Sequence, residues 1–176
     1  MNDSPRITQD IAKACDVLLR GGLVGIPTET VYGLAAVALN EAAVGRVFEA
    51  KARPRSHPLI IHLSPSDDVN RWGELNETAQ LLASAVWPGP LTLLVPRTSL
   101  VPDWVTGGRN TVALRIPAHD MTIALLDALA RLGKRLPAAG GNPQRVGPQV
   151  AVEDSDRDFH SLTGILRIGI PVSDNH

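Results

Sequence analysis

A short polar segment follows the first apolar run of the chain and holds two hydroxyls, a carboxylate and a phenol within five residues. The apolar residues 23–26 predict a buried strand, and the segment PTETVYGL, residues 27–34, comes directly after it. Ligand crevices in open α/β sheets lie outside the carboxyl ends of strands, so this position suits a small polar ligand. Hydroxyls that follow a strand also satisfy backbone groups in ordinary turns. The spacing alone leaves both interpretations open.

A second segment concentrates positive charge. Lys51, Arg53, Arg55 and His57 lie within seven residues, where a predicted helix ends and a predicted strand begins. Lys51 offers a compact charge and Arg53 a planar fork, a combination that neutralises a polyphosphate and holds its oxygens. Cations at a helix C-terminus are also favourable in themselves, by ~0.3–1 kcal/mol each. In a chain whose net charge is -1, the uneven cluster favours an anion site.

Two polar side chains interrupt apolar strands. Arg115 lies within residues 111–116, and a buried guanidinium must either be paired or face a cavity. It can hold a substrate carboxylate through two hydrogen bonds, or it can pair with an Asp or Glu of the chain. His62 lies within the apolar residues 59–63. Taken alone, it is typical of a core histidine.

Other patterns carry less chemistry. The segment AAGGN, residues 138–142, offers backbone N–H groups to an anion, although ordinary turns also contain glycine pairs. The sequence has no Walker A loop, dinucleotide-binding glycine motif, nucleophile elbow or HExxH. Its five histidines do not fall at metal-ligand spacing, so no protein-held metal site is predicted. The single cysteine, Cys15, is interpreted as a core residue of a helix.

Strands and helices alternate along the chain, which predicts one α/β domain with some parallel pairing. Strands are expected at residues 23–26, 59–63, 91–95, 111–116, 136–139 and 165–170. Helices are expected from Ser4-Pro5 to Gly21, from Asn40, from Asn76 to Trp87, and over residues 121–132.

Three further expectations concern burial and connections. The helix that opens at Asn76 is expected to bury Leu81, Leu82, Ala85 and Val86. Residues 66–71 and 96–110 are expected to be surface connections. Residues 144–161 are polar and aperiodic, so no strand or helix is expected there.

Composition limits the class of protein. With 176 residues the chain suits a single domain over residues 1–176. Lys+Arg 17 against Asp+Glu 18 provide no global basic footprint, so contact with RNA would need a local patch. Aromatic residues, at 3%, are too few for base-stacking platforms. No apolar stretch of about 18 residues occurs and the first ten residues are polar, so we expect a cytoplasmic protein without a membrane partner.

Four motifs occur in a specific order and resemble the YrdC-like L-threonylcarbamoyladenylate synthases. The resemblance runs from about residue 10 to residue 142 and continues weakly at residues 163–171. It implies a YrdC-like twisted mixed sheet with helices packed on it and a basic concave face. The motifs are GLVGIPTETVYGLAA, FEAKARPRSHPLIIHL, WPGPLTLLVP and TVALRIPAH.

The resemblance also implies a reaction. Threonine, bicarbonate and ATP would give threonylcarbamoyl-AMP and pyrophosphate, for the threonylcarbamoyl modification of adenosine in tRNA (t6A) by a downstream threonylcarbamoyl transferase. Lys51 and Arg53 match the family's KxR pair and would be the catalytic residues that hold the ATP phosphates. Thr30, His62 and Arg115 match positions that contact threonine or its carboxylated form.

The remaining carried-over positions lie on the nucleotide side. His57 and Thr111 match residues that bind ATP, Asn142 matches the last residue of the family's SxN motif, and Arg167 matches the arginine of the terminal LLRxG segment. Mg²⁺ would arrive with the triphosphate, so no cage of protein ligands is expected. No organic prosthetic group is expected either.

The chain departs from the family pattern in its C-terminal part. Gly140 stands where the family has the serine of SxN, and the family's STVVD segment has no counterpart before GILRIGIP. Each lost hydrogen bond weakens substrate binding. A second hypothesis follows, in which the chain is a catalytically weakened YrdC-like module that binds double-stranded RNA, tRNA or a nucleotide.

Overall fold

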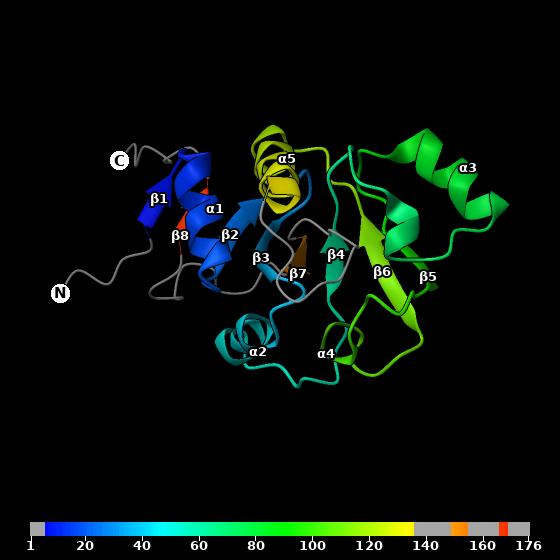
Figure 1. Ribbon diagram of the computed structural model, residues 1–176, viewed down its shortest axis with the longest axis horizontal. Helices are drawn as coiled ribbons and strands as arrows, with labels where there is room; N and C mark the ends of the chain where they lie inside the picture. Colours follow the sequence, from blue (N-terminus) through cyan, green and yellow to red (C-terminus); the bar gives the residue numbers. More distant parts are fainter. Residues whose placement is uncertain (1–5, 136–148, 155–165, 169–176) are drawn as a thin grey trace.

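A mixed eight-stranded sheet organises the chain (Figure 1), in the order β1-β8-β2-β3-β7-β4-β6-β5. The computed structural model describes residues 6–135, 149–154 and 166–168. Parallel pairs join β1 to β8, β8 to β2 and β4 to β6, and the other neighbours are antiparallel. The strands are β1 (Arg6–Thr8), β2 (Val24–Pro27), β3 (Tyr32–Val37), β4 (Ile60–His62), β5 (Leu93–Pro96), β6 (Thr111–Arg115), β7 (Val150–Asp154) and β8 (Leu166–Ile168).

Helices cover both faces of the sheet (Figure 1), and this confirms the α/β prediction. Alternate strand residues face two apolar clusters, as the period of two along a strand requires. The helices are α1 (Ile11–Leu19), α2 (Glu41–Ala50), the 3-10 turn η1 (Val69–Arg71), α3 (Glu77–Val86), α4 (Asp103–Thr106) and α5 (Asp120–Arg135). One cluster includes residues of α1, α5 and β2, and the other includes residues of α2, α4 and β6.

Side chains of Asp10, Asn40 and Asn76 cap the starts of α1, α2 and α3. Asn40 accepts a hydrogen bond from the Ala43 N–H, and Asn76 accepts one from the Ala79 N–H, which confirms both predicted starts. The predicted start at Ser4-Pro5 is wrong, because α1 begins after Asp10 and residues 6–8 form β1 instead. Local cap signals do not reveal that β8 offers β1 a parallel partner.

The strand β7 lies in a region where no element was expected. It lies between β3 and β4, and Val150, Ala151 and Val152 are fully buried. Only these three apolar residues mark it within the polar residues 144–161, so its position in the sheet, and not a local pattern, makes it a strand. β3 was not expected either, and the predicted strand at residues 136–139 lies outside the described residues.

Helix α3 exposes the face that was expected to be buried. Leu81 is 71% exposed, Leu82 43% and Val86 38%, and Ala85 is exposed as well. The helix packs on the core through Ala79 and Ala83. Helical periodicity predicts which residues share a face, but it does not predict which neighbouring element covers that face.

The expected surface connections contain structure. Residues 66–71 include η1, and residues 96–110 include α4, with Val101, Val105 and Thr106 buried. Other expectations are confirmed: Cys15 is buried at 2% exposure, and the predicted strand at 165–170 contains β8. In the part of the chain that the structure describes, no helix is long and apolar enough to span a bilayer.

Candidate functional site

The turn between β2 and β3 is organised by one hydroxyl. The Thr28 Oγ1 donates to the Val31 carbonyl at 2.6 Å and accepts from the Val31 N–H at 3.1 Å. It also lies 3.0 Å from the Thr30 Oγ1. The turn interpretation therefore holds for Thr28, which is buried, whereas Glu29 and Thr30 are exposed residues.

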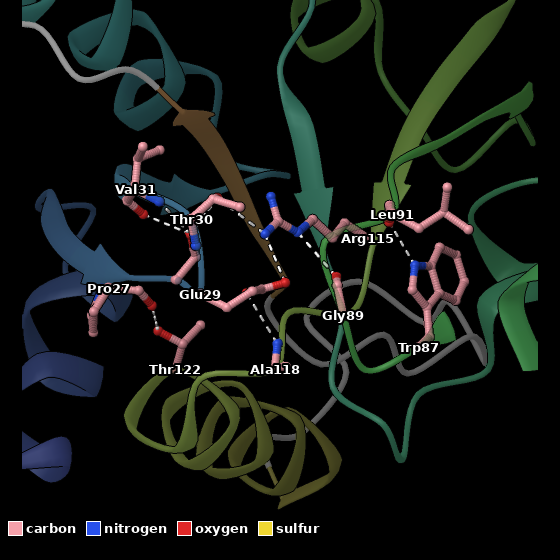
Figure 2. Close-up of polar contacts among 11 residues, drawn as sticks. Pro27, Glu29, Thr30, Val31, Trp87, Gly89, Leu91, Arg115, Ala118 and Thr122 are labelled. Carbon is pink, nitrogen blue, oxygen red and sulfur yellow. Dashed lines mark hydrogen bonds and ion pairs between the residues drawn. The ribbon is translucent and has the colours of Figure 1, made fainter. Parts of the chain in front are cut away.

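The guanidinium of Arg115 points at this turn (Figure 2). Its Nη2 lies 2.8 Å from the Glu29 Oε1 and donates to the Thr30 Oγ1 at 3.3 Å. Its Nε donates to the Gly89 carbonyl at 3.3 Å. Only 4% of the Arg115 side chain is exposed, so a counter-charge is required. Of the two roles predicted for Arg115, the pairing with a carboxylate of the chain is the one present here.

The contact between Arg115 and the turn crosses the face of the sheet. The turn follows β2, Arg115 ends β6, and β3, β7 and β4 lie between these two strands. Figure 2 shows the Arg115 side chain running from β6 toward Glu29 and Thr30. The sequence motif and the arginine are therefore brought together by the fold of the whole sheet, not by neighbouring strands.

Glu29 links three parts of the site (Figure 2). Its Oε1 pairs with Arg115, and its Oε2 accepts a hydrogen bond from the Ala118 N–H at 3.2 Å, on the connection between β6 and α5. Next to it, the Thr122 hydroxyl of α5 donates to the Pro27 carbonyl. Partial burial raises the pKa of Glu29, but hydrogen bonds from Arg115 and the backbone and the positive charge of Arg115 outweigh it, so the net shift is downward. Glu29 is therefore ionised at neutral pH.

His62 lies beside Arg115. The two residues are register partners on the parallel strands β4 and β6, so their side chains share one face of the sheet. His62 is fully buried, and among the described residues neither ring nitrogen has a hydrogen-bond partner. Burial and then the Arg115 charge lower the pKa of His62 to about 3, although the Ile60 backbone and Glu29 oppose the shift. His62 is thus a neutral imidazole with unused hydrogen-bonding capacity.

The segment with Lys51 and Arg53 joins the end of α2 to β4 and runs past α4 (Figure 1). Its Ser56 carbonyl accepts a hydrogen bond from the Arg109 Nη1 at 2.8 Å. The turn between β2 and β3 instead contacts the start of α5, where Thr122 donates to the Pro27 carbonyl. Lys51 is the C-cap of α2 and half-buried, and Arg53 is exposed. His57 is also exposed on the connection to β4.

The remaining predicted residues are less fully described. Thr111 is the half-buried first residue of β6, and because β6 is parallel to β4 it lies at the end of the sheet where β4 begins. Arg167 pairs in register with Gly25 of β2, but its side chain is outside the described residues. Asn142 is outside them too. A basic concave face that includes all these residues stays a prediction.

Sequence reasoning noted the carboxylate of Glu29 but gave it no role. It also overlooked Gly89, whose carbonyl holds the Arg115 Nε. The signal for Glu29 was present, because an acidic residue in a polar turn is a suitable partner for a buried arginine. Which acidic residue that would be depends on the contact across the sheet.

A comparison with protein-family models identifies the family to which the chain belongs. The Sua5/YciO/YrdC family model, described as "Telomere recombination", matches residues 16–172. The chain belongs to this family. Within it, a threonylcarbamoyl-AMP synthase of Pyrococcus abyssi is 48% identical over 162 residues, which are 89% of this chain and 47% of that protein. One of Bacillus subtilis is 42% identical over 118 residues, or 66% of this chain and 34% of that protein. The chain thus spans less than half the length of these two relatives.

A relative of similar length is the threonylcarbamoyl-AMP synthase of Halorhodospira halophila. It is 36% identical over 166 residues, which are 90% of this chain and 83% of that protein. Among solved structures, P. abyssi Sua5 complexed with L-threonine has a TM-score of 0.69 at 38% identity, covering 85% of this chain and 41% of its own. E. coli YciO, at 18% identity and a TM-score of 0.69, covers 94% of this chain and 82% of its own, and shares the fold. The expected YrdC-like fold is therefore confirmed.

No group of three or more His, Cys, Asp or Glu side chains that could hold a metal ion occurs among the described residues. The expectation that Mg²⁺ enters as part of the ATP substrate stays a prediction.

Proposed function

We propose that the chain is an L-threonylcarbamoyladenylate synthase, which makes threonylcarbamoyl-AMP and pyrophosphate from L-threonine, bicarbonate and ATP for the t6A modification of tRNA. The carrying observation is the cluster of Arg115, Thr30 and His62 on one face of the sheet. It combines a buried cation, a hydroxyl and an unpartnered neutral imidazole within reach of one another. Buried polar atoms without partners are rare in proteins, so this cluster suits a small polar ligand.

Threonine matches the chemistry of this cluster. Its carboxylate would bind the Arg115 guanidinium, and its hydroxyl would meet the donors and acceptors of Thr30 and His62. Two comparisons support threonine as the substrate. Similar proteins are named threonylcarbamoyl-AMP synthase, and the structure of P. abyssi Sua5 was solved with L-threonine. A partner enzyme of the threonylcarbamoyl transferase class would consume the product.

The nucleotide would bind along the edge that carries the basic segment. Lys51 and Arg53 would neutralise the phosphates of MgATP, and His57 and Thr111 lie at the same edge for further contacts. Asn142 and Arg167 are the other proposed ATP ligands.

The proposed step joins the two substrates. The threonine amine first attacks bicarbonate, a C–O bond of bicarbonate breaks, and a carbamate and water form. A carbamate oxygen then attacks the α-phosphorus, the bond between that phosphorus and the bridging oxygen to the β-phosphorus breaks, and pyrophosphate leaves. Charge grows on the phosphate oxygens, so fixed cations and in-line placement supply the catalysis. His62, whose pKa is lowered to about 3, and Glu29, whose pKa is also lowered, are both weak bases, so the proton lost by the threonine ammonium passes to solvent or buffer.

The test is direct. The protein is incubated with threonine, bicarbonate, Mg²⁺ and ATP, and threonylcarbamoyl-AMP and pyrophosphate are measured. Lys51→Ala and Arg53→Ala should each reduce the rate by about a hundredfold or more, the scale of loss when a group that stabilises transition-state charge is removed. Arg20→Ala, an exposed arginine at the end of α1, is the matched control and should retain full activity. A folded protein that makes neither product overturns the proposal.

RNA binding that weakens steeply with salt and does not change when threonine is added would then favour the RNA-binding module.

A further inference from the structure

We infer that Glu29 is a specificity-determining residue that receives the ammonium group of the amino-acid substrate when the substrate carboxylate takes its place on Arg115. The inference rests on the proposed function and adds a residue to that same site. Its starting point is that the Arg115 donors facing the turn are already in use. Nη2 forms the ion pair with Glu29 and donates to the Thr30 hydroxyl, and Nε donates to the Gly89 carbonyl. A carboxylate that binds this edge of the guanidinium must displace the Glu29 Oε1.

A displaced Glu29 needs a new positive partner. Its side chain is only 22% exposed, and its Oε2 stays anchored by the Ala118 N–H at 3.2 Å, so the carboxylate is held near Arg115 even after the exchange. A partly buried carboxylate without a counter-charge is costly. An α-amino acid solves this problem, because it carries a carboxylate and an ammonium on the same carbon. One ion pair is replaced by two.

The charge balance of the site favours the same ligand. Glu29 and Arg115 together carry no net charge, and His62 beside them is neutral. A zwitterion keeps the site neutral. A simple hydroxy acid would bring one negative charge and leave Glu29 unpaired, so the site should reject it. The preference for an amino acid thus comes from Glu29, while Arg115 recognises any carboxylate.

The experiment compares two ligands by calorimetry. L-Threonine and 3-hydroxybutyrate differ in the amino group, and wild-type protein should bind threonine at least about tenfold more tightly, the worth of one charged hydrogen bond. In Glu29→Gln, which keeps the size of the side chain and an acceptor for Ala118, threonine binding should weaken by about tenfold and the preference should fall toward one. Glu49→Gln, which alters an exposed ion pair with Arg55, is the matched control and should keep both affinities.

The other outcomes overturn the inference in distinguishable ways. If Glu29→Gln weakens both ligands equally, Glu29 only supports the local structure. If both ligands bind more tightly, Glu29 only blocks Arg115. If Glu29→Gln does not fold, the wild-type measurement still tests the inference. Similar affinities of the wild-type protein for threonine and 3-hydroxybutyrate would show that Glu29 does not bind the ammonium group. If wild-type protein binds neither ligand, the proposed function fails and the inference fails with it.

Discussion

His62 lies directly beside Arg115 in the register of β4 and β6, a neutral imidazole next to a permanent cation. The pair stays buried because the Arg115 charge is balanced by Glu29 from across the sheet, at 2.8 Å from Nη2. The stability of the site and its ability to bind an anion therefore depend on the same three side chains. Both properties can be measured separately in the same variants.

Replacing Arg115 by methionine should cost about 2–4 kcal/mol of unfolding free energy, because it leaves the partly buried Glu29 carboxylate without its counter-charge. Urea denaturation at neutral pH measures this loss. The double variant Arg115→Met/Glu29→Gln should recover part of it, since no charge is then unpaired. A double variant as unstable as Arg115→Met alone would show that the ion pair is not the cause.

The free energy of unfolding should decrease as the pH is lowered below 6.5, where an exposed histidine would become protonated but the buried His62 does not. Its pKa of about 3 in the folded state lies below the ordinary value of 6.5, so the unfolded chain binds more protons between these values and stability is lost as pH falls below 6.5. The slope is about 1.4 kcal/mol per pH unit, or about 2 kcal/mol between pH 6.5 and pH 5.

His62→Phe removes this titration while it keeps an aromatic ring in the same space. The difference in unfolding free energy between pH 6.5 and pH 5 should be smaller in this variant than in the wild-type protein by about 2 kcal/mol. Chemical denaturation at the two pH values gives the comparison. Equal pH dependence in both proteins would contradict a fully buried, neutral His62.

The Thr28 hydroxyl should matter for both folding and ligand binding. Thr28→Val removes the acceptor of the Val31 N–H and the donor to the Val31 carbonyl, which should cost about 1–2 kcal/mol. Threonine affinity should fall as well, because the turn carries Glu29 and Thr30. Thr28→Ser keeps the hydroxyl and should keep most of both properties. The idea fails if the serine variant behaves like the valine variant in thermal unfolding and calorimetry.

Two leucines on different helices should respond very differently to truncation. Leu81 on α3 is 71% exposed, so Leu81→Ala should change the unfolding free energy by less than about 0.5 kcal/mol. Leu129 on α5 is fully buried, so Leu129→Ala should cost about 2–5 kcal/mol. Denaturation of the two variants side by side makes the comparison. A large loss for Leu81→Ala would mean that another surface covers this face of α3.

Local signals were sufficient where the physics is local. The caps Asn40 and Asn76 marked two helix starts, since a cap needs only the next three residues. The apolar run at residues 59–63 marked β4 for the same reason. The motifs around Thr30, His62 and Arg115 were also recognisable from the order of residues alone, and the structure brings these three together.

Tertiary structure decided everything that depends on a distant partner. β1 and β7 became strands because β8, β3 and β4 offered them hydrogen bonds, which no local pattern reports. The exposed face of α3 had the right periodicity, but none of the described elements covers it. Arg115 had two open roles in the sequence, and only the path of the chain across the sheet chose Glu29 as its partner. A buried charge requires a counter-ion, but the residue that supplies it is set by which segments the fold places within hydrogen-bonding distance.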